Sequence, residues 1–227
     1  MKVANWREIV EHAALGDDSQ ARKTFLEKHK SKVIPVVTRI ADFYEEFDAR
    51  GGHWVDNPRS KTTIQFLFAA GNCTLTSLHL FVSCLPLPGG HLMRQSAEAM
   101  AMTLMCATPA CGVLEAYLKD PLKYPIHKAV DQLTKKKMSA AIATHLRFDP
   151  SAWHSLQIFV SFLNGFSHTS PIALGTHIRL GARAEGIVLV SDYDPKKFKF
   201  YRNQLLHLGV IATNLVSLVK RVDTVLR

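Results

Sequence analysis

The chain has 227 residues, of which 47% are hydrophobic and 21% are charged. This composition excludes a disordered tail, a collagen-like chain and a disulfide-stapled mini-protein, and the length suits one domain over residues 1–227. Twenty-eight Lys and Arg against 19 Asp and Glu give a formal net charge of +9. This positive excess is compatible with a polyanionic partner such as nucleic acid.

The sequence lacks the marks of an exported protein. Arg7, Glu8 and Glu11 lie where a signal peptide needs an apolar run, so no signal peptide is expected. The cysteines form no C-x-x-C pair, and three of them lie in apolar helical segments. We therefore expect reduced, buried thiols in a cytoplasmic protein. The cysteines are Cys73, Cys84, Cys106 and Cys111.

Helical periodicity dominates the first part of the chain. A short helix is expected over 3–14, and a long one over 20–48 with a bend at Pro35 and an end at Gly51-Gly52. The apolar stripe expected on the long helix comprises Phe25, Ile34, Val37, Ile40, Phe43, Tyr44 and Phe47.

The next expected helix, over 60–84, lies almost wholly in a stretch without charged residues. From Thr62 to Gly90 there is no Asp, Glu, Lys or Arg, which makes a membrane-spanning segment an alternative. Polar side chains interrupt the stretch, and Pro86 and Pro88 end it. A central helix buried by its neighbours is the favoured interpretation, and no membrane partner is expected.

A further helix is expected over 90–106. Its inward face comprises Met93, Ala97, Met100, Ala101 and Leu104. Arg94 and Glu98 lie one turn apart among these apolar residues, so they are expected to pair. An Arg-x-x-x-Glu helix together with a later Ser-His-x-Ser segment around His168 resembles uncharacterised bacterial helical proteins. Convergence of Arg94, Glu98 and His168 would make either a buried structural network or a small polar pocket.

Asp-Pro pairs mark the expected helix starts in the second half of the chain, because Asp caps a helix and Pro fits its first turn. The pairs predict helices over 121–145, 150–164 and 195–225. Residues 176–193 predict two short strands around a Gly-containing turn. The expected fold is an all-α bundle of about six or seven helices with a small β-hairpin before the last helix.

The last expected helix contains R-N-Q-L-L-H over residues 202–207. This motif resembles the signature of the HEPN superfamily, which is an Arg, a short spacer and a His, often with Asn directly after the Arg. Members are helical-bundle domains, and many are metal-independent ribonucleases of bacterial toxin and phage-defence systems. The resemblance implies Arg202 and His207 as catalytic residues, Asn203 as a supporting residue, no cofactor, and a composite site between two protomers.

The implied chemistry requires these residue types. The RNA 2′-hydroxyl attacks the adjacent phosphate, His207 moves the proton, and Arg202 stabilises the charge of the transition state. Helical geometry places Asn203 and His207 one turn apart, opposite the apolar stripe. That stripe comprises Phe198, Tyr201, Leu205, Leu208, Ala212, Leu215 and Val219. The alternative interpretation is structural, with Arg202 binding a carboxylate at the helix start and His207 an ordinary surface residue.

A segment of alternating lysines and rings, K-K-F-K-F-Y-R, leads into the motif. Positive charge suits phosphates and rings suit bases, so Lys196, Lys197, Lys199 and Phe200 are candidate RNA contacts. Phe200 is the ring expected off the apolar stripe. Alternatively, the rings are core residues of an amphipathic helix and the lysines are its solvated face.

We find no metal-binding motif, P-loop or dinucleotide fingerprint, and no metal site is expected. The leading hypothesis is a metal-independent endoribonuclease or RNA-binding protein of a toxin or defence module. It would act as a homodimer or with a protein partner. The alternatives are a non-catalytic helical interaction protein and, third, a membrane-associated helical protein.

Overall fold

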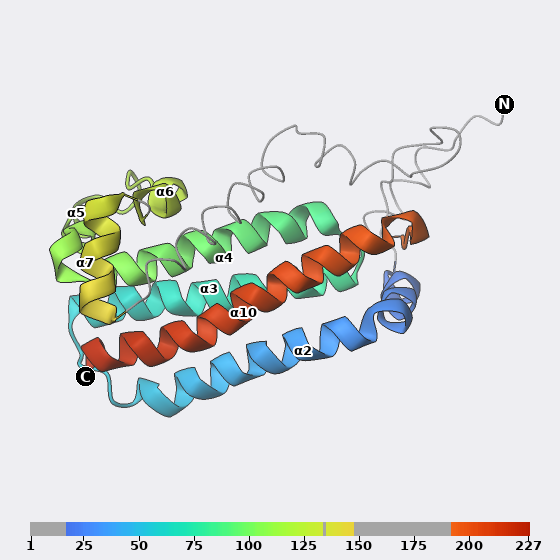
Figure 1. Cartoon of the computed structure of the whole chain (residues 1–227), viewed down its shortest axis with the longest axis horizontal. Coiled ribbons are helices and arrows are strands. Elements are labelled where there is room, and N and C mark those ends of the chain that lie inside the picture. Colours follow the sequence, from blue (N-terminus) through green and yellow to red (C-terminus); the bar gives the residue numbers. More distant parts are fainter. Residues whose placement is uncertain (1–16, 134, 148–191) are drawn as a thin grey trace.

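The computed structural model describes residues 17–133, 135–147 and 192–227. Within these ranges four long helices lie side by side, and three short helices gather at one end of them (Figure 1). The long helices are α2 (Ser19–Gly51), α3 (Pro58–Val82), α4 (Pro86–Ala107) and α10 (Phe198–Leu226). The short helices are α5 (Val113–Lys119), α6 (Ala129–Leu133) and α7 (Lys136–Leu146). The described part contains no strand, which confirms the all-α class.

Three of the long helices, α2, α4 and α10, run in the same direction, and α3 runs against them (Figure 1). The short turn between α3 and α4 makes them an antiparallel hairpin. At the other side of the bundle the ends of α2 and α10 meet, because the amide of Val55 donates to the carbonyl of Leu226 over 2.8 Å. Because the C-terminal ends of α2 and α10 meet here, these two helices are parallel neighbours.

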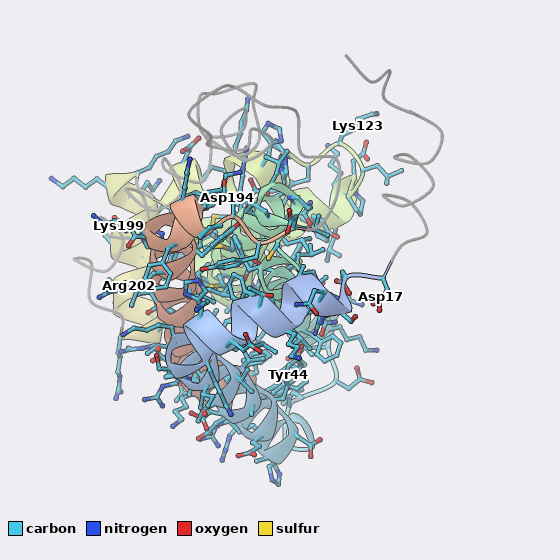
Figure 2. The ribbon with its side chains drawn as sticks, turned by 90° about the vertical axis from the view of Figure 1, so that its right-hand side faces the viewer. Asp17, Tyr44, Lys123, Asp194, Lys199 and Arg202 are labelled. Carbon is cyan, nitrogen blue, oxygen red and sulfur yellow. The ribbon has the colours of Figure 1, made fainter. Side chains whose placement is uncertain are left out.

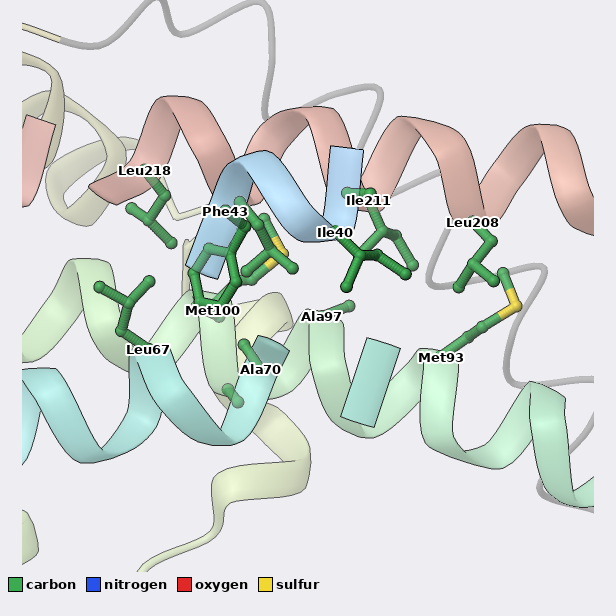
Figure 3. Close-up of a cluster of buried hydrophobic side chains, with 14 of the residues drawn as sticks. Ile40, Phe43, Leu67, Ala70, Met93, Ala97, Met100, Leu208, Ile211 and Leu218 are labelled. Carbon is green, nitrogen blue, oxygen red and sulfur yellow. The ribbon is translucent and has the colours of Figure 1, made fainter. Parts of the chain in front are cut away.

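Each long helix contributes an apolar face to one core (Figure 3). Labelled core residues are Ile40 and Phe43 from α2, Leu67 and Ala70 from α3, Met93, Ala97 and Met100 from α4, and Leu208, Ile211 and Leu218 from α10. The five residues expected to face inward from 90–106 are all buried, as predicted. A close approach of two helices completes the core, since a Cβ on Gly71 of α3 would lie 2.1 Å from a ring carbon of Phe43.

The expected long helices are confirmed, but on α2 the residues that face the core differ from the expected ones. α2 contains Pro35, and its first turns run at an angle to the rest of the helix (Figure 1). Ile34 and Val37 were expected in the apolar stripe but are 51% and 49% exposed. Val33 and Val36 are buried instead, because the apolar run of 33–37 fits two helical rows and only one of them faces α10.

Capping side chains fix two of the helix starts. The Asn57 side chain accepts a hydrogen bond from the amide of Ser60 over 2.9 Å at the start of α3. The Asp194 side chain accepts one from the amide of Lys196 over 2.9 Å. The second bond is the one that the Asp-Pro pair predicts, and the helix expected over 195–225 is confirmed.

The helix expected over 121–145 is wrong. Asp120 and Pro121 lie in a turn, in which the amide of Tyr124 donates to the carbonyl of Asp120 over 3.1 Å. Pro125 follows directly and has no amide hydrogen to continue a helix. Helical structure resumes only with a short 3₁₀ turn, Ile126–Lys128, followed by α6 and α7.

Some expectations fall outside the described residues. These are the helices over 3–14 and 150–164 and nearly all of the hairpin over 176–193. Its last two residues, Asp192 and Tyr193, are described and do not form a strand, so nothing in the described residues supports the hairpin.

The charge-free stretch 62–90 is not one continuous helix. It divides between α3, a turn and α4. Among the described helices, the one at Pro195–Leu226 is long and apolar enough to cross a membrane by length and composition. A core helix of a soluble protein passes the same test, and 44% of its most apolar window is buried in the bundle.

Candidate nucleic-acid interface on the last helix

One face of α10 is buried and the other is exposed. The buried face packs on α2, α3 and α4. The exposed face carries Lys199, Arg202, Asn203, Leu206, Val210, Thr213, Asn214, Ser217, Lys220 and Thr224. Between Pro195 and Leu226 the sequence has a single acidic residue, Asp223, and its side chain is buried. The exposed face therefore offers cations, amides and hydroxyls but no carboxylate.

The predicted motif lies on this face. Arg202 and Asn203 are exposed, and His207 is half-buried. Figure 2 shows Lys199 and Arg202 on the same outer side of α10. Asn203 and His207 are one turn apart and share a side of the helix. Arg202 and His207, in contrast, are separated by about 140° around the helix axis, so a single α10 does not aim them at one point.

The environment of His207 favours the neutral imidazole. Burial lowers the pKa of His207, because a partly desolvated ring loses hydration of its charged form. At neutral pH the ring is then uncharged, which is the form that accepts a proton.

The structural alternative for Arg202 finds no support in the described residues. The carboxylate at the helix start, Asp194, accepts its bond from the Lys196 amide. Within the described ranges, Arg202 has no ion-pair partner. Its charge is therefore available to a phosphate.

The lysines before the motif separate into two groups. Lys196 and Lys199 are exposed, whereas Lys197 is only 7% exposed. Burial lowers the pKa of Lys197, and the charge of Asp194 partly opposes that change. The expectation that Lys197 contacts phosphates is therefore corrected. The reason is local geometry, since Pro195–Lys197 form a 3₁₀ turn with three residues per turn rather than 3.6.

The same turn changes the roles of the two neighbouring phenylalanines. Phe198 was expected in the apolar stripe, but it is 41% exposed and stacks on His29 with ring centroids 4.7 Å apart. Phe200 is half-buried and packs against the core beside Tyr201. Phe198 thus offers more ring surface to a base than Phe200 does.

Sequence reasoning missed the buried aromatic cluster beneath Phe198. His29 is 1% exposed, and its Nε2 lies 3.1 Å from the Tyr193 hydroxyl. Phe25 and Tyr201 contact the His29 ring, and burial lowers the pKa of His29. A His on the apolar stripe of 20–48 was the signal available in the sequence. In the structure, His29 supports the start of α10.

The predicted pair on α4 is confirmed. Arg94 Nε lies 2.8 Å from Glu98 Oε1, and the two side chains are 18% and 11% exposed. His168, the third member of the expected network, lies outside the described residues. The pair is thus established as a largely buried ion pair on one helix.

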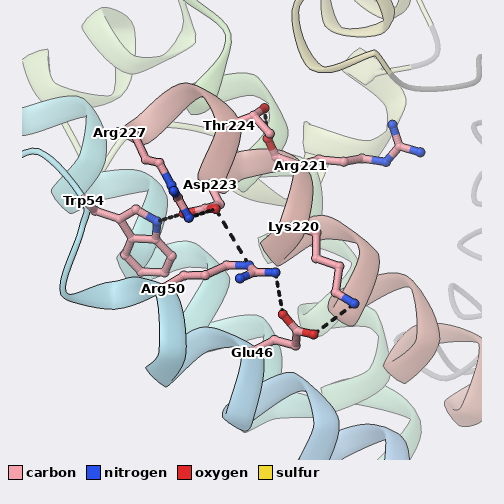
Figure 4. A network of polar contacts seen from close by, with 8 residues as sticks. All are labelled: Glu46, Arg50, Trp54, Lys220, Arg221, Asp223, Thr224 and Arg227. Atoms are coloured by element: carbon pink, nitrogen blue, oxygen red, sulfur yellow. Dashed lines mark hydrogen bonds and ion pairs between the residues drawn. The ribbon is translucent and has the colours of Figure 1, made fainter.

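The C-terminal part of α10 uses its charges to hold neighbouring elements (Figure 4). Glu46 of α2 binds both Arg50 at 2.8 Å and Lys220 at 2.9 Å. The Arg221 guanidinium donates to the carbonyls of Leu146 and Arg147 at the end of α7. The cations that remain for an outside ligand are therefore concentrated at the N-terminal part of α10.

Among the described residues, neither the cysteines nor the side chains that can bind metal ions indicate a second kind of reactive site. All four cysteines are free, and burial raises the pKa of Cys84 and of Cys106 to about 12, which keeps both thiols protonated. Cys73 and Cys111 are half-buried. In the part of the chain that is described, no group of three or more His, Cys, Asp or Glu side chains could hold a metal ion.

Comparisons of the chain with family models, with curated proteins and with solved structures give no match. The resemblance to the HEPN superfamily thus consists of the motif and the helical context of α10.

Proposed function

We propose that this protein is an RNA-binding, metal-independent endoribonuclease of the HEPN type, acting in a toxin or defence module. Arg202 and His207 would be the catalytic residues, and Asn203 would support His207. The observation that carries the proposal is the placement of the motif on a helix face that has cations and amides but no exposed carboxylate.

The chemistry uses only groups of the chain and of the RNA. Neutral His207 takes the proton of the 2′-hydroxyl, and the oxygen attacks the adjacent phosphorus. Arg202 stabilises the additional negative charge. The 5′-oxygen leaves with a proton returned by His207, so the products are a 2′,3′-cyclic phosphate and a 5′-hydroxyl end.

Two protomers supply the geometry that one helix lacks. Because Arg202 and His207 diverge around α10, one phosphate is best reached by the Arg of one protomer and the His of another. From Asn203 to Asn214, α10 has no charged side chain apart from the titratable imidazole of His207, so this stretch of two copies can approach without repulsion.

The decisive experiment is cleavage of a short single-stranded RNA by the purified full chain in the presence of EDTA. His207→Ala should reduce the rate at least about 100-fold, because general base catalysis is lost. His91→Ala is the matched control, since His91 is also half-buried but lies on α4. Cleavage that persists in His207→Ala, or that strictly requires a divalent ion, would contradict the proposal.

A mixing experiment tests the composite site. Arg202→Ala and His207→Ala are each expected to be inactive alone. Mixed in equal amounts, they should recover about a quarter of the wild-type rate, because half of the dimers contain one intact site of two. No recovery after exchange of protomers would place both residues in the site of one protomer.

A second candidate function, a non-catalytic interaction module, is favoured by a different observation. Leu206, inside the motif, and Val210, one turn after it, are 48% and 57% exposed on α10. Neighbouring exposed aliphatic side chains are typical of a surface that contacts another protein.

A further inference from the structure

A hollow of about 520 Å³ lies between the end of α7 and the last third of α10. Sites that hold small organic ligands have volumes of about 300 to 1,000 Å³, so the hollow has a suitable size. Its described lining comprises His145, Leu146 and Arg147 from the end of α7, and Ser217, Lys220, Arg221, Thr224 and Val225 from α10. This lining includes three cations and a histidine but no acidic side chain, so the hollow suits an anion.

Two of the three cations also bind groups of the protein. Arg221 donates to the carbonyls of Leu146 and Arg147, so it fixes the end of α7 against α10. Lys220 is turned toward Glu46 of α2, with its Nζ 2.9 Å from the carboxylate (Figure 4). The Lys220 side chain is 51% exposed and an ammonium group has three donors. Lys220 can therefore keep its bond to Glu46 and still contact an anion in the hollow.

The third cation, Arg147, is held in an unusual backbone conformation. It ends α7 at φ 51°, in the left-handed region, and its amide donates to the carbonyl of Ala143. Glycine is the usual residue at such a helix end, because a side chain strains this conformation. Arg147 accepts the strain and exposes its guanidinium at the hollow. In the part of the chain that the structure describes, this guanidinium has no ion-pair or hydrogen-bond partner.

The lining matches the two parts of a phosphate ester. A guanidinium such as that of Arg147 binds two phosphate oxygens through parallel N–H donors. Lys220 adds a second positive charge, and the His145 ring offers a further N–H donor. Donors from two helices suit the tetrahedral oxygens of a phosphate better than the two coplanar oxygens of a carboxylate. Leu146 and Val225 offer aliphatic surface to the organic group that carries the phosphate.

We propose that this hollow binds a phosphate ester, with Arg147 as its main contact and with Lys220 and His145 as supporting contacts. This site is separate from the motif at 202–207 and does not depend on RNA cleavage. Two sources have this chemistry, which are a free nucleotide and the backbone of an RNA strand.

An RNA strand that is bound at the motif would be able to reach the hollow. Arg202 and Lys220 are 18 residues apart, which is five turns of about 3.6 residues, so they lie on the same side of α10 at a separation of roughly 27 Å. A stacked strand rises about 3.4 Å per nucleotide, so about eight nucleotides cover this distance. With RNA as the source, the hollow would set a minimum length for tight binding, a consequence that rests on the proposed function.

The first test is calorimetric titration of the purified full chain with adenosine 5′-monophosphate and with inorganic phosphate at low salt. Arg147→Gly should weaken binding of the nucleotide at least about tenfold, because it removes a bidentate, charge-assisted contact. The variant should melt at the wild-type temperature or above it, since glycine adopts a positive φ without strain. Lys137→Ala is the matched control, because it removes an exposed cation at the other end of α7.

The second test distinguishes the two sources with single-stranded RNAs of about three and about twelve nucleotides. Binding is measured in the His207→Ala background, so that the proposed cleavage does not consume the RNA. If the source is RNA, Arg147→Gly should weaken binding of the long RNA at least about tenfold and leave the short one unchanged. If the source is a free nucleotide, Arg147→Gly should weaken binding of adenosine 5′-monophosphate and leave both RNAs unchanged.

Two results would overturn the proposal. One is that Arg147→Gly changes the binding of neither the nucleotide, nor inorganic phosphate, nor the long RNA. The other is that Lys137→Ala weakens binding as much as Arg147→Gly does, which would attribute the effect to net charge alone. A wild type that binds the nucleotide through Arg147 but binds no RNA would refute the proposed ribonuclease and leave this site in place.

Discussion

The indole nitrogen of Trp54 donates a hydrogen bond to Asp223 over 3.0 Å, which ties the turn after α2 to the last turns of α10 (Figure 4). Arg227 donates to the same carboxylate, and Arg50 lies 3.8 Å from it. Asp223→Ala should lower the free energy of unfolding by about 2 to 3 kcal/mol, because these donors lose their partner. Urea denaturation measures this change, with the exposed Asp48→Ala as control.

The same carboxylate makes stability depend on pH. Burial by itself raises the pKa of Asp223, but hydrogen bonds from Arg227 and Trp54 and the charges of Arg227 and Arg50 outweigh it, so the pKa is lowered. A lowered folded-state pKa contributes stability above the unfolded-state value, about 4, and this contribution is lost as the pH falls through the folded-state pKa. Melting curves of Asp223→Asn should therefore change less than those of the wild type below about pH 4.

The contact of Gly71 with Phe43 predicts a strong effect of one methyl group. Gly71→Ala should destabilise the fold by about 2 kcal/mol, because a Cβ at 2.1 Å from the ring forces α3 away from α2. Gly52→Ala is the control, since nothing lies within 4 Å of its Cβ position. Equal melting temperatures of the two variants would show that the helices are not packed this closely.

Removing one member of the Arg94–Glu98 pair is expected to destabilise the fold. Replacing both members by apolar side chains is expected to change its stability much less. Glu98→Ala should lower the free energy of unfolding by about 3 kcal/mol, because it leaves a largely buried guanidinium without its carboxylate. The double variant Arg94→Met, Glu98→Leu should recover most of that loss. A denaturation midpoint that Glu98→Ala leaves unchanged would identify the pair as a solvated contact.

The burial of His207 predicts how the cleavage rate changes with pH on the acid side. A general base acts in its neutral form, and the pKa of His207 is lowered by burial. The cleavage rate should therefore hold as the pH falls past 6.5, the ordinary value for His, and decline only as the lowered pKa is reached. A rate that already halves above pH 6.5 would assign the base to another group.

RNA affinity should depend on salt through the exposed cations at the start of α10. Lys196→Ala and Lys199→Ala should each reduce the log–log slope of affinity against salt by about 0.7, as counterion release from single strands requires. Lys123→Ala, with a side chain 86% exposed beyond α5, should leave the slope unchanged. Phe198→Ala should weaken binding by about 1 to 3 kcal/mol if that ring stacks on a base.

Periodicity in the sequence was sufficient to locate the long helices, because each has a regular apolar row that the core needs. It was insufficient where local geometry departs from 3.6 residues per turn. The 3₁₀ turn over Pro195–Lys197 buries Lys197 and exposes Phe198, and no pattern in the chain shows where such a turn ends. The Asp120-Pro121 pair is equally compatible with a helix start and a turn, and Pro125 decides for the turn.

The candidate site was predicted in part. The motif 202–207 is visible in the sequence, but its placement on an acid-free exposed face follows from which side of α10 packs on the bundle. A groove of about 420 Å³ between α2 and α10 could not be predicted, since its two walls come from helices that lie far apart in the chain. It depends on the choice between two apolar rows at 33–37, which the sequence leaves open.

The pairing of α2 with α10 also has a consequence for synthesis of the chain. α2 is complete at residue 51, but the helix that covers one side of it ends at residue 226. At 5 to 20 residues per second, the ribosome needs roughly 9 to 35 s to make the intervening chain. The α3–α4 hairpin forms early because its contacts are local, whereas Val36 and Ile40 stay uncovered until α10 has been synthesised. A nascent chain stalled before α10 would thus expose an apolar helix face, which is the kind of surface that chaperones and proteases recognise.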